Sequence, residues 1–221
     1  LTLTNTISDT DNRPIILKLK SEEDAIVADD VIGSIEFAAG DSDGTDGATV
    51  AAGIHAIAEN TFAASTNPTK LVFTTGVSET AAASATAKMT LSSAGALSVL
   101  GDITALTSDK RLKTNIEIIE DPLEKINKLS GFTYDWSKEK CETAGFKPSD
   151  ERQVGVFAQD IQTVLPEAVK PAPFDSENGK SKSGENYLTV QYEKIVPLLI
   201  ESIKEQQKMI ENLQGQINKL K

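Results

Sequence analysis

Ser108-Asp109-Lys110-Arg111-Leu112-Lys113, in one-letter code SDKRLK, divides the chain into two parts of different character. The part before it is acidic, rich in small residues and strand-like. The part after it carries charged helical segments, several aromatic residues and a terminal heptad repeat. We therefore predict two domains, one over residues 1–107 and one over residues 108–221.

The two parts carry very different charge. Residues 1–107 hold 5 Lys or Arg against 14 Asp or Glu, whereas residues 108–221 hold 17 against 19. Nucleic-acid binding depends on Lys and Arg that neutralise phosphates. We therefore expect no nucleic-acid partner.

Composition limits several other kinds of site. No apolar run is long enough for a membrane span, and no secretory signal pattern is visible at the start. Cys141 is the only cysteine, so no intrachain disulfide can form, and a reducing cytoplasm suits assembly. With one cysteine and one histidine, His55, we expect no metal site and no cofactor. The acidic stretch 40–47 lacks calcium-loop spacing and is interpreted as a turn.

The first part is expected to be all-β. Residues 15–20, 31–37 and 69–74 have strand-like composition, with turn residues between them. A strand-turn-strand is expected over residues 89–105, and His55 is expected to be an ordinary strand side chain. The part has three aromatic residues and is otherwise filled with Ala, Thr, Ser and Val, which is little material for a core. Packing against copies of itself is favoured, with a self-sufficient sandwich as the alternative.

The second part is expected to mix helices and strands. Asp121 and Pro122 predict the start of a helix that ends before Gly131. Residues 132–136 alternate aromatic and polar, residues 154–157 have the pattern of a buried strand, and residues 158–165 that of a helix ended by Pro166. Residues 171–186 are expected to form an exposed, mobile loop that reaches a folding partner or lies plainly on the surface. The predicted fold class is α+β.

The last thirty residues carry a heptad repeat, which indicates self-association through a coiled coil. Position a is occupied by Val196, Ile203, Ile210 and Ile217. Position d is occupied by Tyr192, Leu199, Gln206, Leu213 and Leu220. β-branched residues at a with leucine at d favour a dimer, and the polar Gln206 weakens the seam while fixing its register. Pro197 is expected to start the helix.

Three blocks in a fixed order carry a resemblance to a known family. They are residues 108–116, residues 153–167 with the sequence QVGVFAQDIQTVLPE, and residues 187–199 with the sequence YLTVQYEKIVPLL. In this order they resemble the endosialidase-type intramolecular chaperone, a self-cleaving domain at the C-terminus of phage tail fibres and tailspikes. The resemblance covers nearly all of residues 108–221.

The resemblance implies both an assembly and a reaction. It implies an intertwined homotrimer in which the C-terminal domain folds residues 1–107, its client, into a β fibre. Ser108 would attack the Thr107-Ser108 bond with help from Lys113. The domain would thus be a serine peptidase that cleaves itself once and releases the chaperone. The fibre would belong to the virion, assemble in the bacterial host cytoplasm and bind a host cell-surface receptor.

Two other interpretations stay open. In one, the chain is a receptor-binding fibre that keeps its chaperone and never cleaves. In the other, the domain resembles the release domain of some membrane-tethered transcription regulators, which the acidic first part disfavours.

The spacing of Ser108 and Lys113 constrains the proposed pair. Five residues along a helix place two side chains about 140° apart, and five along a strand place them on opposite faces. Either the backbone turns between them or the lysine comes from a neighbouring chain. A lysine activates serine only as the neutral amine, so its surroundings must favour that form. Lys110 and Arg111 act in that direction and Asp109 acts against it.

Overall fold

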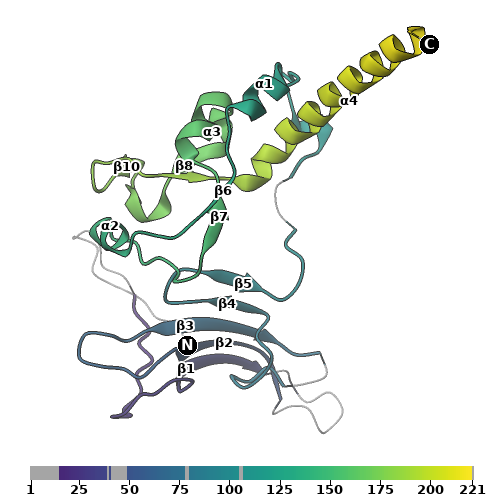
Figure 1. Cartoon of the computed structure of the whole chain (residues 1–221). Helices are drawn as coiled ribbons and strands as arrows, with labels where there is room; N and C mark the ends of the chain where they lie inside the picture. Colours follow the sequence, from purple (N-terminus) through teal and green to yellow (C-terminus); the bar gives the residue numbers. More distant parts are fainter. Residues whose placement is uncertain (1–14, 39, 41–48, 78–79, 105–106, 221) are drawn as a thin grey trace, which may run out of the picture. The chain divides into compact units, whose positions relative to one another are not determined.

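The computed structural model describes residues 15–38, 40, 49–77, 80–104 and 107–220. The chain divides into two compact units, Leu1–Leu106 (unit 1) and Thr107–Lys221 (unit 2), which are described separately (Figure 1). The assignment of a separate task to each half stays a prediction.

Unit 1 is built on one antiparallel sheet in which the strands follow chain order. Its strands are β1 (Val31–Ala38), β2 (Val50–Ala58), β3 (Thr69–Thr75), β4 (Met89–Leu91) and β5 (Leu97–Val99). The strands expected at residues 31–37 and 69–74 are confirmed, as is the strand-turn-strand at β4 and β5, where Gly95 turns with φ +81°. The strand expected at residues 15–20 is wrong, because these residues pair with no strand.

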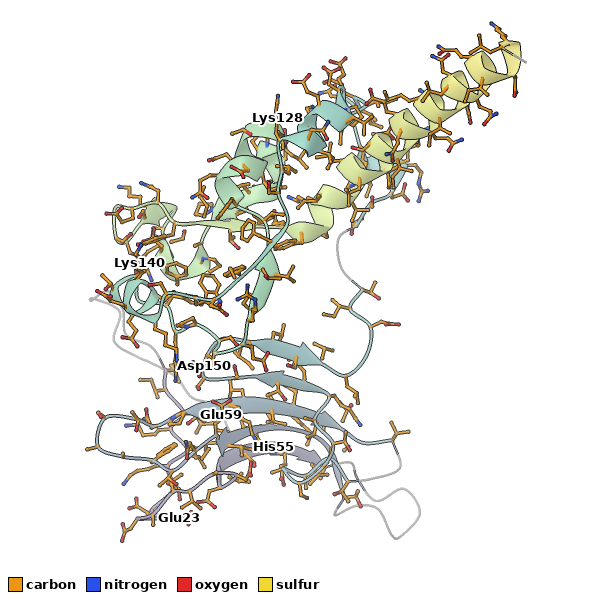
Figure 2. All side chains as sticks on the ribbon, in the orientation of Figure 1. Glu23, His55, Glu59, Lys128, Lys140 and Asp150 are labelled. Carbon is orange, nitrogen blue, oxygen red and sulfur yellow. The ribbon has the colours of Figure 1, made fainter. Side chains whose placement is uncertain are left out.

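One face of this sheet is tied together by a buried histidine. His55 of β2, labelled in Figure 2, is fully buried. Its Nδ1 lies 2.8 Å from Ser34 Oγ on β1, and its Nε2 lies 2.9 Å from Thr74 Oγ1 on β3 and 3.2 Å from the Ala81 carbonyl oxygen. Thr74 Oγ1 donates to the same carbonyl. His55 is therefore a strand residue, as expected, but it also joins three strands through polar contacts.

The opposite face is apolar and only partly covered. A single cross-strand row consists of Ile35, Ile54, Phe73, Met89 and Val99. The next row on this face contains Leu71, Leu91 and Leu97. Of these, Ile35, Val99 and the three leucines are exposed. The sheet thus covers the face that carries His55, Ile57 and Val72 and leaves much of the opposite, apolar face open.

Unit 2 consists of short elements followed by one long helix. Its helices are α1 (Pro122–Asn127), α2 (Lys138–Thr143), α3 (Ala158–Val164) and α4 (Val196–Lys219). Its 3₁₀ helices are η1 (Lys110–Leu112), η2 (Pro166–Ala168), η3 (Pro173–Asp175) and η4 (Tyr192–Ile195). Its strands are β6 (Phe132–Tyr134), β7 (Gln153–Gly155), β8 (Val169–Pro171), β9 (Ser176–Glu177), β10 (Lys180–Ser181) and β11 (Leu188–Val190). The α+β class is confirmed, with a long C-terminal helix (Figure 1).

The core of unit 2 is small and lies beneath α3. Ile161, Ala168 and Val169 are buried there. Leu188 and Val190 of β11, which pairs with β8, pack against them. Apolar residues on α3 therefore meet a two-stranded sheet, and the rest of the unit depends on smaller contacts.

Helix α4 uses one face within its own chain. Leu198 and Ser202 are buried where α4 contacts α1. Glu205 Oε2 accepts a 3.2 Å hydrogen bond from the backbone N of Leu123, at the start of α1. Asp121 was expected to cap this helix, but its side chain makes no capping bond and its φ is +47°. The first turn of α1 therefore receives a cap from α4.

Several other expectations for unit 2 need correction. Helix α1 ends at Asn127, several residues short of Gly131, and α2 was missed. The strand β7 forms, but Val154 is 76% exposed and Phe157 is also exposed. β7 pairs only with β6, and the rest of the single chain leaves both side chains largely uncovered. Residues 171–186, expected as a hairpin-like arm or a plain surface loop, contain a short hairpin of β9 and β10, and a contact with a folding partner stays a prediction.

Candidate functional site

The SDKRLK stretch folds into a single turn of 3₁₀ helix. Lys110–Leu112 form η1, with Asp109 before it and Lys113 after it, both in extended conformation. The backbone N of Leu112 donates to the Asp109 carbonyl oxygen at 3.1 Å, and that of Lys113 donates to the Lys110 carbonyl oxygen at 3.2 Å. The chain thus turns between Ser108 and Lys113, which is the first of the two alternatives that their spacing allows.

The turn brings the two predicted reactive side chains together. Lys113 Nζ donates a 2.6 Å hydrogen bond to Ser108 Oγ within one chain. This is the contact required for proton transfer between a serine and a lysine. Activation of the serine requires Lys113 to accept the Ser108 hydroxyl proton. The catalytic roles of both residues stay predictions.

The site is open to water in a single chain. Ser108, Lys113 and Thr107 are all exposed. Leu112 is 74% exposed, and Ile116 and Ile118, which follow along the chain, are exposed as well. Three large apolar side chains close to the pair in sequence are therefore left uncovered in the single chain.

Asp109 and Arg111 form a close ion pair beside the turn. Arg111 Nη2 lies 2.7 Å from Asp109 Oδ2, and Arg111 Nε lies 3.1 Å from Oδ1. The hydrogen bonds from the Arg111 side chain, and to a smaller extent that from its backbone N, lower the pKa of Asp109. The Asp109 carboxylate in turn raises the pKa of Arg111. Sequence reasoning treated these residues only as charges. The overlooked signal is the ability of an Asp side chain to accept a hydrogen bond from the backbone N–H two residues later, as Asp109 does from Arg111.

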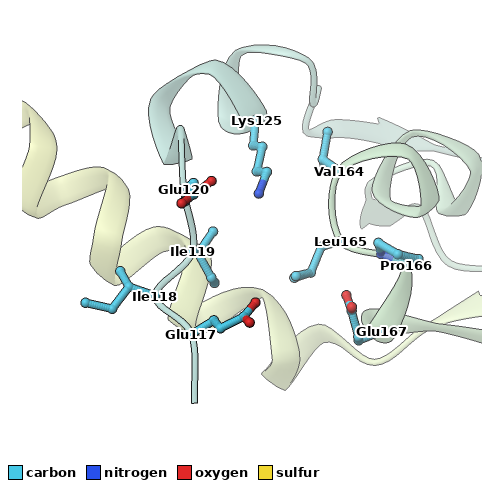
Figure 3. Close-up of a pocket in the computed structure, with 9 residues that line it drawn as sticks. All are labelled: Glu117, Ile118, Ile119, Glu120, Lys125, Val164, Leu165, Pro166 and Glu167. Carbon is cyan, nitrogen blue, oxygen red and sulfur yellow. The ribbon is translucent and has the colours of Figure 1, made fainter. Parts of the chain in front are cut away.

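A hollow of about 810 Å³ follows the site along the chain. Residues 117–120 form one wall, and Val164–Glu167 form the other (Figure 3). Figure 3 shows Glu117, Lys125 and Glu167 directed into it. The described lining contains carboxylates, one ammonium and apolar groups, but no serine, cysteine or histidine. The hollow therefore supplies no nucleophile to the Ser108 and Lys113 pair.

The predicted seam residues lie along one exposed stripe of α4. All are exposed in the single chain: Val196, Leu199, Ile203, Gln206, Ile210, Leu213, Ile217 and Leu220. Leu220 follows the last helical residue, and Tyr192 lies in η4, before α4. The Tyr192 hydroxyl accepts a 3.4 Å hydrogen bond from the backbone N of Val156. Tyr192 therefore contacts its own unit, and the exposed seam begins at Val196.

Searches for other kinds of site gave three results. Over residues 15–38, 40, 49–77, 80–104 and 107–220, no group of three or more His, Cys, Asp or Glu side chains is placed to hold a metal. None of the helices in these ranges combines the length and the apolar character that a membrane crossing requires. Cys141 is a free, buried thiol. The acidic stretch 40–47 lies almost wholly outside the described residues.

Known sequences agree with this picture of unit 2. Residues 108–170 match the family described as "Chaperone of endosialidase", Peptidase S74. "Long tail fiber protein Gp37" of Enterobacteria phages K3 and T2 is 36% identical over 112 residues, which are 51% of this chain and 8% of the relative. The protein of the same name from Enterobacteria phage M1 is 35% identical over 109 residues, 49% of this chain and 39% of the relative. The chain thus spans well under half of each relative.

A solved structure is also similar. It is the carboxy-terminal domain of the bacteriophage T5 L-shaped tail fiber with its intra-molecular chaperone domain, at a TM-score of 0.32 and 13% identity. The match covers 92% of this chain and 61% of that one. By the sequence matches, residues 108–170 are similar to the chaperone of endosialidase family, and about half of the chain is similar to phage long tail fibre proteins.

Proposed function

We propose that residues 108–221 act as the intramolecular chaperone of a phage tail fibre, with residues 1–107 as their client. The family match from Ser108 onward and the similarity to long tail fibre proteins support the proposal. In this proposal the fibre is a virion component that assembles in the host cytoplasm, and its mature β part contacts a receptor on the host cell.

The chaperone acts by joining copies of the chain through α4. Leu198 and Ser202 are buried on the side of α4 that is used within the chain, whereas the heptad stripe from Val196 to Leu220 is exposed. A helix with one face used internally and a second apolar face unused is suited to a coiled coil. The number of copies, three, comes from the family resemblance, because the heptad alone favours two.

The sheet of unit 1 supplies a reason for needing a chaperone. Its apolar face, with Ile35, Leu71 and Leu97 exposed, is stable in water only when another surface covers it. Copies held together by α4 place three such faces at high local concentration. Prior joining of the copies thereby reduces the entropy cost of aligning non-local strands, which is the slow and aggregation-prone step.

Release of the chaperone is a single peptide cleavage at Thr107-Ser108. Ser108 Oγ attacks the Thr107 carbonyl carbon while Lys113, as the neutral amine, takes the hydroxyl proton. The C–N bond breaks, the proton passes to the new amino group of Ser108, and an ester joins Thr107 to Oγ. Water then hydrolyses the ester to give the Thr107 carboxylate and a free Ser108 hydroxyl. The 2.6 Å contact between Lys113 Nζ and Ser108 Oγ carries this part of the proposal.

Assembly provides the condition that makes Lys113 a base. In one chain the ammonium is exposed to water, which favours the charged form. Contacts between copies that bury Leu112, Ile116 and Ile118 exclude water from the pair and favour the neutral amine. Cleavage then follows assembly and leaves a mature fibre that is kinetically hard to unfold.

The second candidate is a receptor-binding fibre that keeps its chaperone. The exposure of Ser108 and Lys113 in the single chain favours it, because the pair lacks the water-excluded surroundings that cleavage requires. In this case the Lys113 to Ser108 contact only stabilises the turn.

Intact mass and gel mobility of freshly assembled protein separate the two candidates. Cleavage predicts a fragment that begins at Ser108 in the wild type and no such fragment in Ser108→Ala or Lys113→Ala. Lys128→Ala, which removes an exposed cation outside the SDKRLK turn, keeps the cleavage. An assembled wild type that stays whole establishes the retained form.

The chaperone role has its own test. Residues 1–107 produced without the second part are expected to fold slowly and to aggregate, whereas the full Ser108→Ala chain assembles normally. Equal folding of both proteins would rule out a chaperone role for residues 108–221.

A further inference from the structure

Asp109, which precedes η1, and Arg111, in the middle of η1, contact each other through several atoms. Asp109 Oδ1 accepts a 2.8 Å hydrogen bond from the backbone N of Arg111, so its side chain caps η1. The Arg111 side chain returns to the same carboxylate, with Nη2 at 2.7 Å and Nε at 3.2 Å from Oδ2. One carboxylate therefore holds both the backbone and the side chain of Arg111.

We call the contacts between Asp109 and Arg111 the clamp. The clamp lies in the segment between Ser108 and Lys113. Ser108 precedes Asp109, and Lys113 follows η1 directly. A regular helix or strand keeps side chains five residues apart from meeting. The capped turn is thus the local structure that allows Lys113 Nζ to reach Ser108 Oγ.

The ion pair between Asp109 and Arg111 also answers part of the electrostatic question that the sequence left open. Arg111 and Asp109 carry opposite charges within hydrogen-bonding distance, so each compensates the other. Neither leaves an uncompensated charge beside the pair. The side-chain atoms of Lys113 and Ser108 therefore lie next to a nearly neutral group.

We infer that Asp109 and Arg111 are positioning residues for the Ser108 and Lys113 pair. Asp109 builds the turn as its cap, and Arg111 acts through Asp109 by holding that carboxylate in the capping orientation. The inference rests on the proposed function for its catalytic meaning, but the effect on geometry can be measured without cleavage.

The two residues affect local geometry far more than global stability. Arg111 is largely exposed and Asp109 is partly exposed, and ion pairs open to solvent contribute little to the free energy of unfolding. A capping side chain, in contrast, determines whether a short turn forms. Substitutions should therefore slow cleavage while the thermal unfolding midpoint stays unchanged.

The first experiment measures the first-order rate of fragment formation in assembled full-length protein. Asp109→Ala is expected to slow cleavage about tenfold or more, and Asp109→Asn, which keeps a capping oxygen, stays within about threefold of the wild type. Arg111→Ala is intermediate. Because Arg111 acts through Asp109, the double Asp109→Ala/Arg111→Ala variant is no slower than Asp109→Ala alone.

Two further observations distinguish positioning from other roles. A positioning defect lowers the plateau of the pH–rate profile without moving its midpoint, whereas a direct acid–base role for Asp109 moves the midpoint. Asp135→Ala is the matched control, because it breaks another exposed Asp–Arg pair, with Arg152, and leaves the rate within twofold.

The second experiment detects the turn without cleavage. In a Cys141→Ala background, Ser108→Cys and Lys113→Cys form a disulfide whose equilibrium with glutathione measures how often the two positions meet. Asp109→Ala is expected to lower the effective concentration of these thiols about fivefold, and Asp109→Asn is expected to leave it unchanged. This result stands even when the wild type never cleaves, so failure of the proposed reaction is distinguished from failure of the positioning role. Equal disulfide equilibria in Asp109→Ala and the parent would overturn the inference.

Discussion

Glu205 on α4 holds the backbone N of Leu123, at the start of α1, in a 3.2 Å hydrogen bond. Eighty-two residues separate the two in sequence. The contact fixes the first turn of α1, which lacks a cap of its own because the Asp121 side chain makes no capping bond. The helix that presents the seam is thereby tied to the part of unit 2 that follows the SDKRLK turn.

Removal of this interaction should destabilise unit 2. Glu205→Ala is expected to lower the free energy of unfolding by about 1 kcal/mol, the usual cost of a lost cap. Glu205→Gln retains an acceptor oxygen and loses less. Urea unfolding of the full chain followed by circular dichroism measures both, with Glu211→Ala, an exposed position on the same helix, as the control. A loss as large in Glu211→Ala would show that the effect comes from removing a negative charge on α4 and not from the cap.

The seam on α4 should control association without affecting the single chain. Ile210→Asp places a charge in the middle of the stripe, and we expect association to weaken at least a hundredfold because the charge must be buried between helices. Lys208→Asp puts the same charge at an f position, outside the stripe, and should associate as the wild type does. Sedimentation equilibrium over a range of concentrations compares the two. Equal association of the two variants would show that this stripe of α4 is not part of the interface.

The same residues show what the sequence can and cannot predict. The heptad predicted a long helix and the exposed stripe because both follow from spacing along one element. The buried strand expected at Val154 and Phe157 was wrong because an apolar pattern shows that a side chain needs cover without showing whether its own chain supplies the cover. Helix α2 was missed since its short, charged sequence has one buried residue, Cys141, and no periodicity.

The candidate site divides in the same way. Recognition of the three sequence blocks selected Ser108 and Lys113, and their spacing showed that a turn or a second chain was required. The spacing did not show whether the turn or the second chain applies, because the choice depends on the cap from Asp109 and on the backbone hydrogen bonds of η1. The network of Ser34, His55 and Thr74 was not foreseen because these residues meet only through strand register.

Gly53 leaves the space into which the His55 ring fits. A Cβ at this position would lie 2.3 Å from His55 Nε2 and 3.1 Å from the Ala81 carbonyl oxygen. Gly53→Ala is therefore expected to destabilise unit 1 by about 1 to 3 kcal/mol through overpacking of a buried polar network. Gly101→Ala, where nothing lies within 4 Å of the added atom, should cost little. Thermal unfolding of both variants gives the comparison, and similar melting of the two would show that the ring moves aside without cost.

Asp175 organises the hairpin of β9 and β10 and should make it sensitive to acid. Its carboxylate accepts hydrogen bonds from the backbone N of Ser183 at 2.8 Å, from Ser181 Oγ at 2.8 Å and from the backbone N of Tyr187 at 3.1 Å. Burial acts to raise the pKa of Asp175, but these hydrogen bonds outweigh it and lower the pKa from 3.8 to about 2.

The lowered pKa sets the pH range in which stability changes. Above about pH 4 the carboxyl is ionised in both the folded and the unfolded chain, and its stabilising effect is complete. As the pH falls from about 4 to about 2, the unfolded chain binds a proton that the folded chain does not, so the stability is progressively lost. Asp175→Asn should melt at a lower temperature than the wild type at pH 6, and this difference should shrink across that range. Glu177→Gln, an exposed carboxyl in the same hairpin, should show no such convergence, and a constant difference for Asp175→Asn down to pH 2 would mean that shape, not charge, makes Asp175 important.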